Sequence, residues 1–148
     1  MSMKQILPFL LIINMVTQSL AAKHRTCEFD LEVAPDGSGD FISIQEAIDA
    51  VPHLRKSRTT IYIRNGIYKE KLILPTTKIN VTFLGESVSS TVITYDDYAS
   101  KKNSFGEEMG TSGSSGFYIF GDGFIARNIT FSNSAGPVGQ AVAVRIDG

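Results

Sequence analysis

Three features of the sequence predict an all-β fold. Short runs rich in β-branched and aromatic residues recur from Thr59 to the last residue, clusters of Gly, Asn, Asp, Ser and Pro separate them, and one segment alone has amphipathic helical spacing. A doubly wound sheet is disfavoured because no helices stand between the strands. A solenoid, a sandwich or a barrel is therefore expected, and strand spacing does not choose among them.

The first segment, residues 1–22, is expected to be a secretory signal peptide. Lys4 precedes an apolar run from Ile6 to Val16, and the small side chains of Ser19-Leu20-Ala21-Ala22 suit signal peptidase. The alternative, a membrane anchor, is weaker because the run is shorter than the ~20 residues that a spanning helix needs. We therefore expect residues 23–148 to form the mature domain, without a membrane anchor.

Charge and cysteine content limit the partners and the covalent structure. The net charge of −1 argues against a strong electrostatic attraction to nucleic acid or to an anionic membrane. Cys27 is the single cysteine of the 148 residues, so no disulfide can form within the chain. The sequons Asn80-Val81-Thr82 and Asn128-Ile129-Thr130 agree with an exported protein.

One short helix is predicted near the N-terminus. It follows the turn cluster Pro35 to Asp40, and Ser43 with Glu46 matches a capping box, in which each side chain satisfies a free amide of the first turn. Apolar residues at helical spacing then run from Ile44 to Val51, where Pro52 ends the helix. We expect this helix to cover one end of a stack of strands.

The strand-like runs are short and end at turn residues. Asn65-Gly66 would suit a hairpin. In the run that contains Asn128 to Phe131, apolar and polar residues alternate, so Ile129 and Phe131 should face a core. The predicted strands are Leu31–Ala34, Thr60–Ile63, Lys71–Leu74, Ile79–Leu84, Thr91–Thr94, Phe117–Phe120, Phe124–Phe131 and Ala141–Ile146.

The least regular segment, Ser100 to Gly116, is expected to be a long loop. Loops of this length are usually functional or disordered, and its charged residues are predicted to be solvated. The aspartates of the chain that lie near turns are predicted to act as turn formers: Asp36, Asp40, Asp96, Asp97 and Asp122.

Several segments resemble the plant pectin methylesterases. The strongest are GFIARNITFSNSAGP with the following QAVAVR, and VAPDGSGDF near the N-terminus; IYIRNGIYKEKL and TVITYDD are also in register. The likeness runs from about Leu31 to the last residue. It implies a right-handed parallel β-helix, in which coils stack and side chains form inward columns, and hydrolysis of methyl esters on galacturonan.

The resemblance also implies a catalytic apparatus, of which this sequence holds part. In that family an aspartate is the nucleophile, a second aspartate is the acid and base, and glutamine amides form the oxyanion hole. Gln140 matches the first of these glutamines, at the start of the last predicted strand. Thr111 falls where the family has a threonine that contacts the polysaccharide, although the segment around it departs from the plant TTFxSAT pattern.

The catalytic aspartates of that family lie in segments of the type YQDTLY and VDFIFG, which follow the QAVAL-like strand. This sequence stops before them. We therefore expect a truncated β-helix, the N-terminal part of the domain, that is inactive alone.

The resemblance implies methyl-esterified homogalacturonan (pectin) and a proteinaceous pectinesterase inhibitor as partners, a secreted protein of the cell wall, and no cofactor or metal. The alternative is a non-catalytic galacturonan-binding fragment. A calcium-dependent lyase is also conceivable, but no paired carboxylates are visible on the predicted strands. A serine esterase is disfavoured, since there is no GxSxG motif and neither His24 nor His53 has a triad-like context.

Overall fold

The computed structural model describes residues 29–147, so the predicted signal peptide, His24 and Cys27 lie outside the described residues. Within 29–147, no helix is long and apolar enough to cross a membrane. The elements are, in chain order, β1 (Leu31–Val33), α2 (Ile44–Ala50), β2 (Thr59–Ile63), β3 (Gly66–Lys69), β4 (Leu72–Leu74), β5 (Val81–Gly85), β6 (Thr91–Tyr95), α3 (Gly110–Gly113), β7 (Phe117–Ile119), β8 (Ile125–Arg127), β9 (Thr130–Asn133) and β10 (Val144–Ile146).

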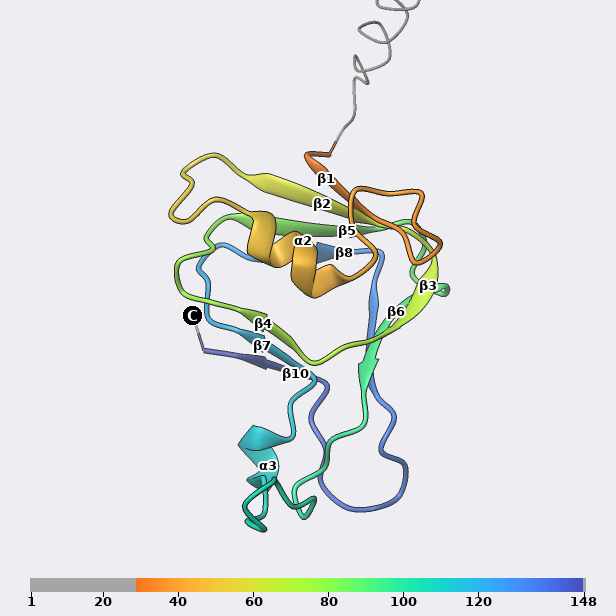
Figure 1. The fold of residues 1–148 in the computed structure, drawn as a ribbon, viewed down its shortest axis with the longest axis vertical. Helices are drawn as coiled ribbons and strands as arrows, with labels where there is room; N and C mark the ends of the chain where they lie inside the picture. The colour runs from red at the N-terminus through yellow and green to blue at the C-terminus, as the bar shows by residue number, and fades with distance from the viewer. Residues whose placement is uncertain (1–28, 148) are drawn as a thin grey trace, which may run out of the picture.

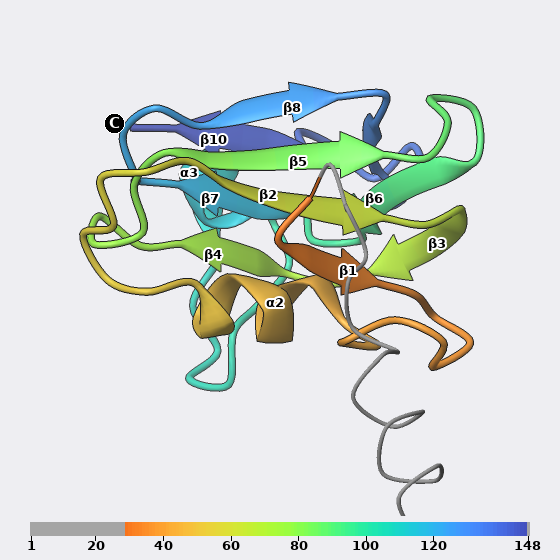
Figure 2. The ribbon, with the colours of Figure 1, turned by 90° about the horizontal axis from the view of Figure 1, so that it is seen from above.

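The strands form three parallel sheets that the chain visits in turn (Figures 1 and 2). Sheet A has the order β1-β2-β5-β8, sheet B has β3-β6-β9, and sheet C has β4-β7-β10. Every ladder between these strands is parallel. Three successive coils result, namely β2-β3-β4, β5-β6-β7 and β8-β9-β10. The fold is therefore a parallel β-helix, and the sandwich and barrel alternatives are wrong.

The register of the sheets builds inward columns of side chains. Ile61, Phe83 and Ala126 are partners on successive strands of sheet A. The corresponding columns are Tyr68, Ile93 and Phe131 in sheet B, and Leu72, Phe117 and Val144 in sheet C. Apart from Ala126, which is exposed, the side chains of the three columns belong to one core or pack against it, as expected of inward columns.

Aromatic rings fill the core between the second and third coils. Phe83 and Phe117 are fully buried and stack with ring centroids 5.6 Å apart. Phe124 meets both rings edge-on, at 5.1 Å and 5.6 Å. Offset-stacked and edge-to-face pairs of this kind stabilise by about 0.5–1.5 kcal/mol each beyond the burial of their area. These contacts join sheets A and C across the coil interior.

Helix α2 covers the first coil at the edge of sheet C, as the sequence predicted. The Gln45 side-chain amide takes the place of a neighbouring strand at this edge. Its Oε1 accepts from the Ile73 N–H at 2.9 Å, and its Nε2 donates to the Ile73 carbonyl at 3.2 Å. Ser43 Oγ accepts from the Glu46 N–H, so this half of the predicted capping box is confirmed. The other half is not formed by Glu46. Instead the Glu70 carboxylate accepts from the first two helical amides.

The edge of sheet A beyond β1 is also covered. Asp40 Oδ2 accepts from the Glu32 N–H at 3.0 Å, and Phe41 exchanges backbone hydrogen bonds with Glu32 and Ala34. Asp40 therefore covers the edge of sheet A as well as lying in the predicted turn. Asp36 acts as predicted, since its carboxylate accepts from the N–H and hydroxyl of Ser38.

Three predictions about strands are wrong. Asn65-Gly66 is not a hairpin turn, because the chain passes from sheet A into β3 of sheet B, a strand that the sequence analysis missed. The run Phe124–Phe131 is two strands, since Asn128 takes φ +56° and turns the chain from sheet A into sheet B. The last strand begins at Val144 instead of Ala141.

Candidate functional site

The structure brings together the two residues predicted for the site. Thr111 lies in α3, the short helix before β7, and Gln140 lies in the loop between β9 and β10. The Thr111 hydroxyl donates to Gln140 Oε1 at 2.6 Å, across 29 positions of sequence. Both residues are exposed. Figure 1 shows α3 and this loop projecting together from one end of the sheets.

Gln140 lies before the last strand, which corrects the expectation that it opens that strand. Individual hydrogen bonds hold its backbone instead of a sheet ladder. The Gln140 carbonyl accepts from the Ala99 N–H at 2.8 Å. Two residues further along, the Val142 carbonyl accepts from the Gly116 N–H and from Asn133 Nδ2. The loop is thus attached to the second coil and, through Asn133, to the third coil, of which it is part.

The side-chain amide of Gln140 has one engaged end and one open end. Its Oε1 is the acceptor for Thr111, while its Nε2 donates to no group within residues 29–147. Thr111 therefore fixes the orientation of the amide and leaves its N–H donors facing solvent. An oriented amide donor can stabilise an oxygen that becomes negatively charged during a reaction.

Hydrogen bonds to the carbonyl groups of its last two residues hold helix α3 in place. The Gly113 carbonyl accepts from Lys71 Nζ at 3.1 Å and from the Tyr118 hydroxyl at 2.7 Å. The same hydroxyl also lies 3.1 Å from the Ser112 carbonyl. Lys71 Nζ lies 5.7 Å from the centroid of the Tyr118 ring, a cation–π distance.

Asp97 lies at the base of this arrangement and is not merely a turn former. It is buried, and its two carboxylate oxygens accept from two lysines: Oδ2 from Lys71 at 2.5 Å and Oδ1 from Lys101 at 2.8 Å. Burial by itself raises the pKa of Asp97, but the hydrogen bonds from Lys101 and Lys71 outweigh it and hold the pKa below its ordinary 3.8. Sequence reasoning missed this cluster because Lys71 belongs to the preceding coil.

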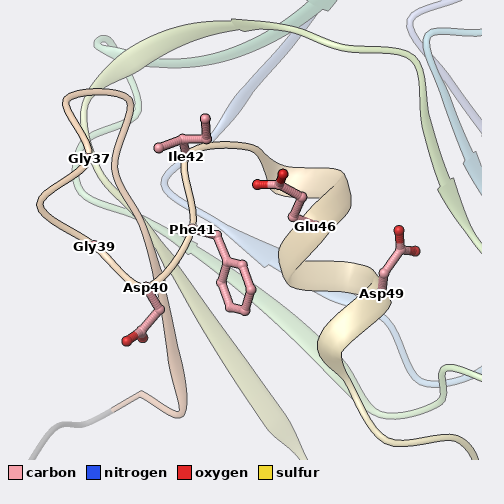
Figure 3. Close-up of a pocket in the computed structure, with 7 residues that line it drawn as sticks. All are labelled: Gly37, Gly39, Asp40, Phe41, Ile42, Glu46 and Asp49. Carbon is pink, nitrogen blue, oxygen red and sulfur yellow. The ribbon is translucent and has the colours of Figure 1, made fainter.

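A hollow of about 540 Å³ lies beside α2, far along the chain from Thr111 and Gln140 (Figure 3). Three carboxylates line it, those of Asp40, Glu46 and Asp49, and Figure 3 shows that they do not converge. No group of three or more His, Cys, Asp or Glu side chains in the described part of the chain could hold a metal ion.

The fold defines a class, the parallel β-helix proteins, and comparison with known proteins identifies the family. The Pectinesterase family model matches residues 30–148. "Probable pectinesterase/pectinesterase inhibitor 44" from Arabidopsis thaliana is 41% identical over 120 residues, which are 80% of this chain and 22% of that protein. The chain belongs to the pectinesterase family.

Solved structures agree. The pectin methylesterase from carrot is 41% identical with a TM-score of 0.70, over 84% of this chain and 37% of that one. A pectin methylesterase in complex with a hexasaccharide is 28% identical with a TM-score of 0.73, over 81% and 39%. The right-handed parallel β-helix is confirmed by these neighbours. The chain spans from 19% to 38% of the length of the first three curated relatives that it matches.

Proposed function

We propose that this chain is the N-terminal part of a pectin methylesterase, an enzyme that hydrolyses the methyl esters of galacturonan and releases methanol. The observation that carries the proposal is the Thr111–Gln140 hydrogen bond, which aims a free amide donor at solvent beside an exposed threonine. Family membership supplies the reaction, since the relatives are named for it.

In the proposed reaction, a carboxylate attacks the ester carbonyl carbon and the carbonyl oxygen becomes an oxyanion. The carbonyl re-forms as methoxide leaves, taking a proton from the second aspartate that the family resemblance implies, and methanol results. Water then hydrolyses the acyl–enzyme anhydride to the free acid and the original carboxylate. Gln140 Nε2 would donate to the oxyanion. Loss of one such donor typically costs about 2.7–4 kcal/mol of transition-state stabilisation. Thr111 would orient the amide and contact the polysaccharide.

Asp97, the buried carboxylate linked to this site, is not free to be the nucleophile, because it is paired with two lysines. This favours the second candidate function for residues 29–147 by themselves, a galacturonan-binding fragment without turnover. We propose that it is exported to the cell wall by the segment 1–22. Pectin is the proposed partner, and a proteinaceous inhibitor is a second one, because several relatives carry the double name pectinesterase/pectinesterase inhibitor.

Two assays test the proposal. Retention of the chain on immobilised, highly esterified pectin should fall in Gln140→Ala and in Thr111→Ala, whereas Thr76→Ala, an exposed threonine in the turn after β4, should behave like the parent. Methanol release should be absent from the chain alone. Equal retention of all four proteins, or clear turnover that survives Gln140→Ala, would refute the assignment of Gln140.

A further inference from the structure

We propose that Lys71 and Asp97 are positioning residues: their ion pair clamps Thr111 against Gln140 from beneath. The importance of that contact for pectin rests on the proposed function, but the clamp itself can be measured without any polysaccharide. The inference begins from Asp97, which is 4% exposed although it lies in a corner of the chain near an exposed loop.

The first arm of the clamp reaches Thr111. Lys71 Nζ donates at once to the Asp97 carboxylate and to the Gly113 carbonyl, at 2.5 Å and 3.1 Å. Gly113 is the last residue of α3, which carries Thr111. The ammonium also lies over the rings of Tyr95 and Tyr118, at 5.9 Å and 5.7 Å from their centroids. The position of α3 is therefore tied to the charge of Asp97 through a single ammonium.

The second arm reaches Gln140 through the backbone. Asn133 Nδ2 donates to the Asp97 carbonyl at 2.9 Å and to the Val142 carbonyl at 3.2 Å, so one amide links the two segments. Ala99, two residues after Asp97, donates its N–H to the Gln140 carbonyl. Movement of Asp97 would thus displace the backbone at Gln140 and at Val142.

The clamp draws on all three coils. Lys71 comes from the corner between β3 and β4, Asp97 follows β6, and Asn133 ends β9. The other charged groups around Asp97 are Lys101, which donates to Oδ1, and the neighbouring pair Lys69 and Asp96. Asp96 also lies 3.8 Å from Lys101, but it makes no contact with Lys71 or α3.

This geometry makes the Thr111–Gln140 contact depend on the negative charge of Asp97. If the carboxylate is neutralised, Lys71 loses its strongest partner and the restraint on Gly113 weakens. Asp96 offers a matched control, since it is the adjacent aspartate, it pairs with two lysines of the same cluster, and it lacks the link to α3.

Nuclear magnetic resonance of the ¹⁵N-labelled chain tests the clamp. Thr111→Ala breaks the contact directly and so marks the position of the released Gln140 side-chain amide signals. Asp97→Asn and Lys71→Met should move those signals toward the Thr111→Ala position and should lower protection of the Gly110 amide against hydrogen exchange by at least about tenfold. Lys71→Arg should restore most of both, and Asp96→Asn should leave both unchanged.

Unchanged β2 and β5 amide signals in each variant show that the fold persists. Where Asp97→Asn does not fold, the parent protein is titrated with acid. Its Gln140 signals should then move at a pH below 3.8, and they should move in the same way in Asp96→Asn. Coincident Gln140 signals in the parent, Asp97→Asn and Lys71→Met would overturn the clamp. Absence of pectin retention by the parent would instead refute the proposed function and leave the clamp intact.

Discussion

Close packing between successive coils leads to a specific prediction about Gly85, the last residue of β5. A Cβ atom placed there would lie 2.2 Å from the carbonyl oxygen of Asn128 and 2.8 Å from Cγ1 of Ile129, in the corner between β8 and β9. Carbon atoms in proteins pack at about 3.5–4.0 Å. The corner would therefore have to retreat by about 1 Å or more, against a strand spacing of about 4.8 Å.

We expect Gly85→Ala to destabilise the protein by about 1–3 kcal/mol, the usual cost of overpacking a well-filled interior. For a domain of this size the loss corresponds to a fall in Tm of about 4 °C per kcal/mol. Thermal unfolding followed by circular dichroism measures it. The control is Gly37→Ala, where φ is +79° and nothing lies within 4 Å of the new methyl, so that only about 1 kcal/mol of backbone strain is expected. A Gly85→Ala protein that melts at the temperature of the parent would show that the corner at Asn128 accommodates the methyl group without cost, and would refute the reasoning.

Three further predictions concern side chains. Lys78 is 3% exposed and donates to two carbonyls at the C-terminal end of α2, so Lys78→Met should lower the free energy of unfolding, measured by urea titration, by about 1–3 kcal/mol, and an unchanged free energy of unfolding would contradict this cap. The pKa of Asp97 is below 3.8 in the folded state, so its stabilisation is complete at higher pH and is lost as the pH falls below about 4; Asp97→Asn should flatten the acid limb of the stability curve. Asn128 is exposed and its side chain donates to no described group, whereas Asn80 donates to a carbonyl. After export from a eukaryotic cell, the glycan mass should vanish in Asn128→Gln and persist in Asn80→Gln.

The parts of the fold that sequence predicted are those with local signals. Helix α2 follows from its apolar spacing and the Ser43 cap. Short β-rich runs between turn residues predicted six strands, namely β1, β2, β4, β5, β6 and β7. The corners were harder, because a β-helix can turn at a single residue. Asn128 turns the chain with one positive φ inside a run that otherwise reads as one strand.

The pattern of strands along the sequence did not indicate which strands lie on one another, because the number of residues per coil differs from coil to coil. Sheet A pairs Thr59 with Val81, whereas Thr82 pairs with Ile125, which lies much further along the chain because the second coil carries the long loop before β7. Only the resemblance to a known family chose the solenoid. It also brought attention to Thr111 and Gln140, but nothing in either segment signalled that their side chains meet.

The cluster around Asp97 shows why the site could be predicted only in part. Its lysine partners come from the preceding coil and from the loop, and a pattern of local charges indicates nothing more than a solvated surface. Burial of a carboxylate at a corner becomes visible only when the coils are stacked.

The Gln45 amide has a consequence for assembly. Gln45 hydrogen-bonds the backbone of Ile73 at the edge of sheet C, and Asp40 and Phe41 hydrogen-bond the backbone of Glu32 at the edge of sheet A. At the first coil, these two sheet edges are therefore covered against pairing with a strand of another molecule. The stack is consequently directional: it can be extended by further windings on the β8–β9–β10 side, while its opposite end resists fibril-like joining to another molecule.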